Sequence, residues 1–265
     1  MNIQTVSGRT FAYDDAGVGQ PTLVLIHAFP LSREMWKPQV ETLSPEFRVL
    51  APDLPGFGGT AGFSDNPSVD RMAEAVAEFL DALSLTEPIV LAGLSMGGYV
   101  ALAFARKHRD RLRGLILADT RAEPDDAAAQ ANRDKMIAFA KDHSALDVID
   151  QMLPKMVSDE TRSQRPKVVD EVRRIAAAQP IGGIINALPA LRDRPDARSD
   201  LADIAVPTLV IVGAEDALTP PALSKELAVR LRAVLEIVPG AGHLSNLEKP
   251  AEFTAAVRRF LQGLG

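Results

Sequence analysis

The sequence predicts an α/β protein built on a doubly wound, mostly parallel sheet. Short apolar runs typical of buried strands alternate with longer segments that have apolar residues at helical spacing. This alternation holds over residues 1–120 and resumes over residues 201–265. Such a strand and helix repeat is typical of parallel sheets covered by helices on both faces. We therefore expect these two parts of the chain to form one core domain, with a sheet of eight strands flanked by helices.

The first part of the core contains six of the expected strands. Two of them lie within residues 1–15, and the chain turns between them at Ser7-Gly8. This pattern predicts an antiparallel hairpin at the edge of the sheet. The four remaining strands of this part are expected at 22–27, 47–51, 88–92 and 115–118. The run at 22–27 is continuously apolar, as expected of a strand covered on both faces, and the run before the elbow has the same buried-strand pattern. We expect helices at 32–43 and 97–107, and between them a helix capped by Asn66 with Pro67 at its first position.

Residues 121–200 interrupt this alternation. Alanines and charged residues recur there at helical spacing, and we expect the helices to be broken by prolines at 154, 180, 189 and 195. An excursion this long between two strands of one sheet predicts a helical cap inserted over a site. The alternative is that these helices cover one edge of the sheet. After the cap, the chain resumes with strands at 208–212 and 234–238 and helices at 220–231 and 250–261.

Composition excludes several classes of function. At 265 residues and 46% hydrophobic content, the chain can bury a large single core, and a net charge of -6 without a basic run disfavours nucleic acid and anionic membranes as partners. The absence of cysteine excludes disulfides and thiolate sites. No secretory signal or membrane span is evident, so we expect a cytoplasmic protein. We expect a small-molecule partner, with a homodimer left open. No histidine or carboxylate pair has metal-ligand spacing, so we expect no metal or other cofactor.

The segment Gly93-Leu94-Ser95-Met96-Gly97 carries the strongest functional signal. It follows a buried-strand pattern and precedes a helical one, which is the context of the G-x-S-x-G nucleophile elbow. Glycine at 93 and 97 avoids a collision across a sharp turn. The helix that follows directs its N-terminal amides toward the space above the Ser95 hydroxyl, where an anionic intermediate would form.

A serine nucleophile needs a base, and the base needs an oriented acid. His243 lies in a glycine-rich loop directly after the last expected strand, and Asp216 follows the strand at 208–212. Both loops fall at carboxyl ends of strands, as the elbow does. We favour Asp216 as the acid because its loop lies beside that of His243, while Glu215 and Asp119 stay as competitors.

The order Ser95, Asp216, His243 is that of the α/β-hydrolase family, and the chain resembles this family along nearly its full length. The resemblance implies the α/β-hydrolase fold, the triad and an oxyanion hole. The family segment His-Gly-x-Pro is matched by His27-Ala28-Phe29-Pro30, which implies that the backbone amides of Phe29 and Met96 bind the oxyanion. Ala28 departs from the usual glycine, and alanine would be costly there if φ were positive. We interpret His27 as holding this loop, with direct substrate contact as the alternative.

Within the family, the sequence is most similar to the branch of 3-oxoadipate enol-lactonases and small carboxylesterases. The elbow, the loop from Pro52 to Gly58 and the helical cap carry this likeness. It implies a serine hydrolase that cleaves carboxylic esters of small substrates through an acyl-enzyme. The alternatives are an enol-lactonase-like lactonase or a carbon-carbon bond hydrolase, and further a perhydrolase or a non-catalytic binding protein of this fold.

The expected substrate contacts are Phe29, Met96, Met136 and Met152. Methionine side chains in the cap would give an aliphatic, adaptable wall, although the same residues could instead form the core of the cap. An enol-lactonase must also bind a substrate carboxylate, which calls for a cation. Arg121 is the nearest candidate in the sequence, but we favour a solvated arginine at this position.

Overall fold

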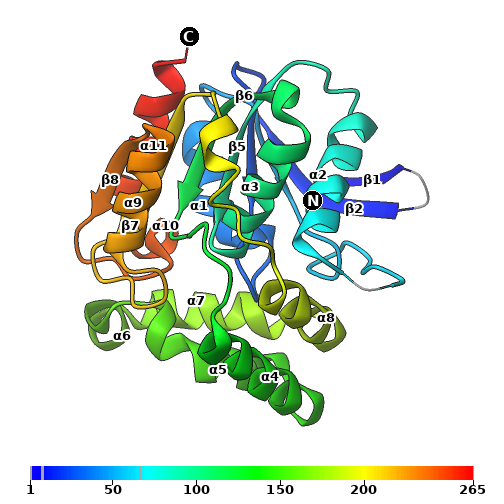
Figure 1. The fold of residues 1–265 in the computed structure, drawn as a ribbon, viewed down its shortest axis with the longest axis vertical. Coiled ribbons are helices and arrows are strands. Elements are labelled where there is room, and N and C mark those ends of the chain that lie inside the picture. The colour runs from blue at the N-terminus through cyan, green and yellow to red at the C-terminus, as the bar shows by residue number, and fades with distance from the viewer. Residues whose placement is uncertain (1, 7–8, 66, 265) are drawn as a thin grey trace.

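A computed structural model describes residues 2–6, 9–65 and 67–264. Within these residues, eight strands form one sheet in the order β1-β2-β4-β3-β5-β6-β7-β8, with β1 and β2 antiparallel and the strands from β4 to β8 parallel (Figure 1). The strands are β1 Asn2–Val6, β2 Arg9–Ala16, β3 Leu23–Ile26, β4 Val49–Pro52, β5 Ile89–Leu94, β6 Leu112–Ala118, β7 Thr208–Gly213 and β8 Val234–Val238. The predicted fold class is confirmed. The turn predicted at Ser7-Gly8 lies outside the described residues.

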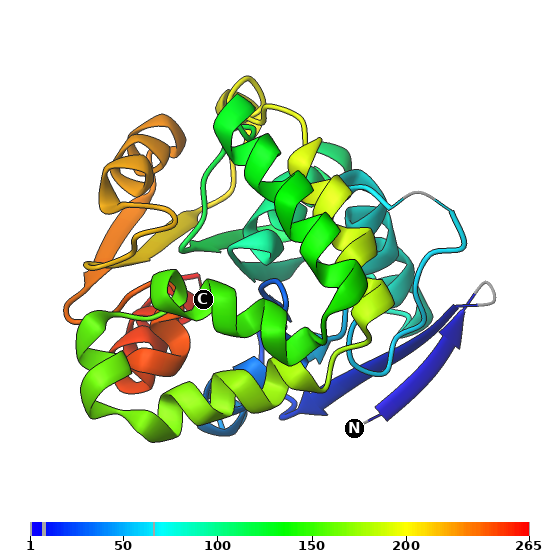
Figure 2. The same ribbon diagram turned by 90° about the horizontal axis from the view of Figure 1, so that it is seen from below.

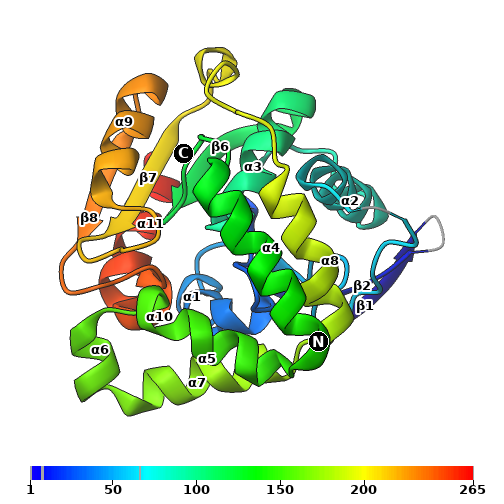
Figure 3. The ribbon, with the colours of Figure 1, turned by 60° about the horizontal axis from the view of Figure 1, so that its bottom comes forward.

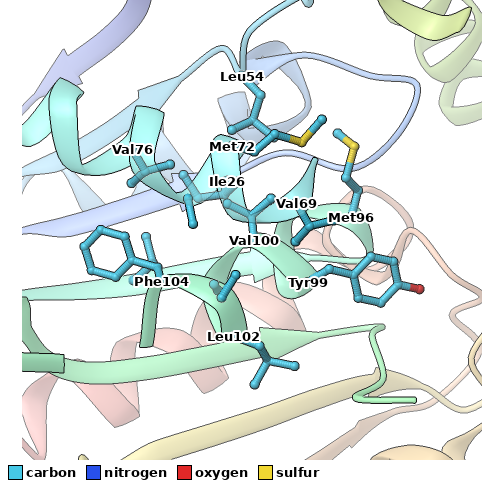
Figure 4. Packing of buried hydrophobic residues seen from close by; sticks show 14 of the residues in the cluster. Ile26, Leu54, Val69, Met72, Val76, Met96, Tyr99, Val100, Leu102 and Phe104 are labelled. Atoms are coloured by element: carbon cyan, nitrogen blue, oxygen red, sulfur yellow. The ribbon is translucent and has the colours of Figure 1, made fainter. Parts of the chain in front are cut away.

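Helices cover both faces of the sheet because successive strand residues point to opposite sides. Val24 and Ile26 belong to a core packed under α2, α3 and α9, whereas Leu23 and Leu25 pack against α1 and α11. Figure 4 shows the first core between α2 and α3. These helices are α1 Lys37–Leu43, which continues the 3-10 turn Arg33–Trp36, α2 Val69–Ala82, α3 Met96–Lys107, α9 Pro221–Leu231, α10 Ser245–Glu248 and α11 Pro250–Gln262. Two further 3-10 turns span Arg109–Arg111 and Leu201–Asp203.

The start of α2 differs from the prediction. Ser68 has an extended backbone, and its side chain accepts a hydrogen bond from the backbone N–H of Arg71, so Ser68 is the N-cap and Pro67 precedes the helix. Asn66 lies outside the described residues. Serine and asparagine are about equally favourable N-caps. Which of them caps the helix therefore depends on which side chain the backbone before the helix places next to the free N–H groups of the first turn.

Five helices between β6 and β7 form a separate layer, which we call the cap. Figure 1 shows the cap below the sheet, and Figures 2 and 3 show α4 beside α8 and α5 beside α7. Pro154 and Pro189 lie inside helices and do not break them, contrary to the prediction. Each proline removes one backbone hydrogen bond, and buried neighbours on both sides hold the helix together. The cap helices are α4 Ala127–Asp142, α5 Ala145–Met156, α6 Asp159–Gln164, α7 Pro166–Ala177 and α8 Ile181–Arg192.

The parallel strands place their carboxyl ends at one edge of the sheet, which is where ligands bind in such folds. The loops after β5, β7 and β8 carry Ser95, Asp216 and His243 respectively. None of the helices in the described part of the chain is long and apolar enough to cross a membrane.

Candidate active site

Ser95 occupies a strained turn between β5 and α3. Its φ of 55° and ψ of -111° are rare for a residue with a side chain, and its backbone N–H donates to Ala118 O at 2.9 Å. The Thr120 hydroxyl donates to Ser95 O at 2.9 Å from the adjacent strand end. The turn is therefore held by neighbouring strands, which is the condition under which such strain persists.

The glycines of the elbow are required by close backbone contacts. A Cβ on Gly93 would lie 2.0 Å from Gly97 O, and a Cβ on Gly97 would lie 2.2 Å from Ile26 O. Both distances are far below contact range, as the sequence argument expected. A Cβ on Gly98 would collide with the Thr120 side chain at 2.4 Å, so the third glycine is also constrained.

The structure brings Ser95, His243 and Asp216 together. His243 Nε2 lies 2.8 Å from Ser95 Oγ, and His243 Nδ1 lies 2.9 Å from Asp216 Oδ2. The histidine is 3% exposed. In this arrangement Nδ1 carries a proton toward the carboxylate, which leaves Nε2 free to accept the proton of the serine hydroxyl.

Asp216 is held in place by its own loop. Its Oδ1 accepts from the backbone N–H groups of Leu218 and Thr219 at 2.8 and 2.9 Å, and the Thr219 hydroxyl donates to Oδ2 at 2.5 Å. Burial raises the pKa of this carboxyl, but the charge and hydrogen bond of His243, together with the hydrogen bonds from Thr219, bring it below the ordinary value. Asp216 is therefore ionised at neutral pH and can stabilise a protonated His243.

The two other carboxylates considered as the partner of His243 lie elsewhere. Glu215 is exposed, whereas Asp119 is fully buried at the end of β6 with a φ of 45°. Asp119 accepts from Gly213 N at 2.8 Å and from the Ser245 hydroxyl, so it ties the loop of Asp216 to the loop of His243. Burial and the negative charge of Asp216 raise the pKa of Asp119 well above its ordinary value. Asp119 thus lies near the triad, and the carboxylate bonded to His243 is that of Asp216.

The expected oxyanion donors flank Ser95. Phe29 and Met96 both line the cavity that contains Ser95, and within the described residues their backbone N–H groups have no hydrogen-bond partner. Ala28 is not among the described residues with positive φ, so alanine is tolerated there. Two free amide N–H groups beside Ser95 can donate hydrogen bonds to an oxyanion.

His27 holds the loop that carries Phe29. Its Nε2 accepts from Leu54 N at 2.9 Å and its Nδ1 donates to Ala28 O at 3.0 Å. Burial lowers the pKa of His27, so the ring is neutral and can make both contacts at once. Its bonding agrees with the interpretation from the sequence.

A cavity of about 680 Å³ joins the triad to the cap. The predicted contacts Met136 and Met152 line it, together with Met156 from the core of the cap. The methionines therefore contribute both to the cavity wall and to the packing of the cap. Arg121 also lines the cavity, where its side chain is 22% exposed and pairs with Asp125 at 2.7 Å.

Sequence reasoning missed several residues that support the site. Thr219 bonds the acid, and the fully buried Glu248 accepts from Gly242 N at 2.9 Å and from Ser158 N at 2.8 Å. Glu248 therefore links the loop of His243 to the cap. A threonine three residues after an aspartate is a local turn signal that could have pointed to Thr219, whereas Glu248 resembles an ordinary helix residue in the sequence. Among the described residues, no group of three or more histidines and carboxylates is placed to hold a metal ion.

Known proteins resemble this chain both in sequence and in structure. Residues 23–257 match the model of the alpha/beta hydrolase family. A 3-oxoadipate enol-lactonase of Acinetobacter baylyi is 27% identical over 92% of this chain and 90% of its own length. A pimeloyl-[acyl-carrier protein] methyl ester esterase of Neisseria meningitidis is 29% identical over 91% and 93%. The solved structure of a thermophilic esterase from Thermogutta terrifontis with malate bound has a TM-score of 0.93 and 39% identity, covering 98% of this chain and 97% of that one.

Proposed function

The chain belongs to the alpha/beta hydrolase family, and from this membership and the geometry of its site we propose that it hydrolyses carboxylic esters of small substrates. Ser95 is the nucleophile, His243 the general base and acid, and Asp216 the residue that orients His243. The observation that carries the proposal is the unbroken chain of hydrogen-bond distances, 2.8 and 2.9 Å, from Ser95 Oγ through His243 to Asp216. Ser95 and His243 line a cavity that is large enough for a small ester.

The proposed reaction has two steps. His243 Nε2 takes the proton of Ser95 as Oγ attacks the ester carbonyl, and the amides of Phe29 and Met96 bind the oxyanion of the tetrahedral intermediate. The alcohol leaves with the proton from His243, which forms an acyl-enzyme on Ser95. Water then attacks the acyl group, with His243 again taking a proton, and the free acid leaves.

A lactone is the second substrate to test, because it is a cyclic ester and the same steps open its ring. The observation that favours it is the likeness to an enol-lactonase over nine-tenths of both chains. Lactone opening differs in one respect, since the alcohol formed stays attached to the acyl group. Comparison of turnover of enol-lactones with that of open-chain esters separates the two candidates.

The test is hydrolysis of short p-nitrophenyl esters by the wild type and by Ser95→Ala. Loss of the nucleophile should lower kcat by about 10⁴- to 10⁶-fold. Ser163→Ala is a matched control because Ser163 is an exposed serine on α6 that does not line the cavity, and it should leave kcat unchanged.

Covalent labelling makes the test independent of the choice of ester. A serine-reactive phosphonate should label the wild type and Ser163→Ala but not Ser95→Ala. Labelling of Ser95→Ala to the same extent as the wild type, or failure of the wild type to label or turn over any ester, would exclude the proposed mechanism.

A further inference from the structure

The cavity beside Ser95 has an excess of positive charge on its cap side. Four cationic residues line it, and Asp125 is the single carboxylate among its described lining residues. The cations are Arg121, Arg133, Lys135 and Lys155. The chain as a whole has a net charge of -6, so this positive potential is local to the cavity. A concave surface of one sign concentrates ligands of the opposite sign.

Three arginines converge on Asp125. Its carboxylate is fully buried and lies 2.7 Å from Arg121 Nη2, 3.0 Å from Arg133 Nε and 2.6 Å from Arg194 Nη1. Burial raises the pKa of Asp125, but Arg133 and Arg194 bring it below the ordinary value, so the group is ionised. One negative charge therefore faces three positive ones, and the cluster can accept a second anion.

Arg121 places this cluster close to the reacting atoms. It directly follows Thr120, whose hydroxyl donates to Ser95 O. Its Nε is buried and has no hydrogen-bond partner among the described residues. Tyr99, one turn along the helix that begins after Ser95, also lines the cavity, and Figure 4 shows its hydroxyl directed away from the apolar cluster.

We propose that Arg121 and Arg133 form a subsite for a free carboxylate of the substrate, so that the preferred substrates are esters or lactones carrying a second, ionised acid group. Half-esters of short dicarboxylic acids are the simplest members of this class. The inference rests on the proposed ester hydrolysis. A guanidinium group matches a carboxylate in shape and donor spacing, which suits it to this task better than an ammonium group.

The rest of the cavity fits this assignment. Lys135 and Lys155 are exposed, and neither has an ion-pair partner within the described residues, so both charges remain available to attract an anion. Met136, Met152 and Leu188 line the same cavity and would contact a short methylene chain.

A matched pair of substrates tests the subsite by turnover. The half-ester 4-nitrophenyl hydrogen glutarate carries a free carboxylate, and 4-nitrophenyl valerate has the same number of acyl carbons without it. We expect a higher kcat/KM for the glutarate ester, and this preference should fall about 10- to 100-fold in Arg133→Gln. Arg173→Gln removes a cap arginine that pairs with Asp150 outside the cavity, and it should retain the wild-type preference. An unchanged preference in Arg133→Gln would overturn the proposal.

Binding without turnover separates this inference from the proposed function. Calorimetric titration of glutarate into Ser95→Ala protein should give binding that weakens at high salt, with glutaramide as the uncharged control. Arg121→Gln and Arg133→Gln, each added to Ser95→Ala, should weaken glutarate binding at least about tenfold. If glutarate binds in this way while the wild type turns over neither ester, the subsite stands and the hydrolase proposal fails. If glutarate binds no better than glutaramide, the subsite is excluded whatever the ester activity.

Discussion

The two walls of the cavity are built in different ways. On the sheet side, His243 and Asp216 are buried, and their side chains are fixed by neighbouring loops at distances of 2.5 to 2.9 Å. On the cap side, Met136 and Met152 are only partly buried, and three arginines form one cluster around Asp125. On the proposed function, the sheet edge sets the chemistry and the cap selects the substrate. Changes on the sheet side should therefore affect every ester, whereas changes in the cap should alter stability or preference.

The largest expected effect distinguishes the two buried carboxylates on the sheet side. Asp216→Asn should lower kcat by about 10⁴-fold, because an amide at this position no longer fixes the tautomer of His243. Asp119→Asn should lower kcat less than about tenfold. The raised pKa of Asp119 means that its surroundings favour the uncharged side chain, and asparagine is uncharged. Steady-state kinetics on one short ester measures both. A larger loss for Asp119→Asn than for Asp216→Asn would reverse the assignment of the acid.

The next effect concerns the charge cluster around Asp125, just before the first cap helix α4. Asp125→Asn should reduce the free energy of unfolding at pH 7 by about 3 kcal/mol, because three arginines lose their shared partner. The pKa of Asp125 is lowered in the folded state, so its contribution is present above the unfolded pKa and is lost as pH falls through the folded pKa. Urea unfolding at decreasing pH should show wild type and variant converging. A difference that stays constant down to about pH 3 would mean that ionisation of Asp125 contributes nothing.

The contact between cap and sheet loops predicts a smaller effect at two adjacent glycines of α8. A Cβ on Gly183 would lie 1.8 Å from Gly56 O, whereas a Cβ on Gly182 would meet nothing within 4 Å. Gly183→Ala should destabilise the protein by about 1 to 3 kcal/mol, because the two backbones must move apart. Gly182→Ala should stabilise it by up to about 1 kcal/mol through helix propensity. Thermal or denaturant unfolding of the two variants checks the pair, and equal effects would exclude this close approach.

The smallest expected effect is on the choice of acyl chain. Met152→Leu nearly conserves volume, so it should change the ratio of kcat/KM between long and short acyl esters by about threefold to tenfold with little loss of stability. Met72→Leu, in the core under α2 and outside this cavity, is the control and should leave the ratio unchanged. A change in turnover of all esters by the same factor would place Met152 among residues that affect the chemistry.

The fold could be predicted wherever a short-range signal decides it. Apolar runs predicted the central strands β3, β5 and β7, which are buried along their whole length, because a strand buried on both faces excludes polar side chains. The edge strand β8 was also predicted, although it contains Glu236 and is largely exposed. Local signals gave wrong predictions where two of them compete or where packing overrides one. Ser68 and Asn66 are both good caps, and Pro154 and Pro189 are helix breakers in isolation, yet packing in the cap keeps both helices continuous.

The sequence by itself determined the family resemblance and the order of Ser95, Asp216 and His243, because an elbow and its glycines follow from the sterics of one short turn. The tertiary structure alone decided that Asp216 rather than Asp119 bonds His243, and that Arg121 lines the cavity with Arg133. Residues of one turn are held at fixed distances by covalent geometry. The spacing between loops that are far apart in the chain depends on how the strands and the cap pack, and no local pattern records that packing.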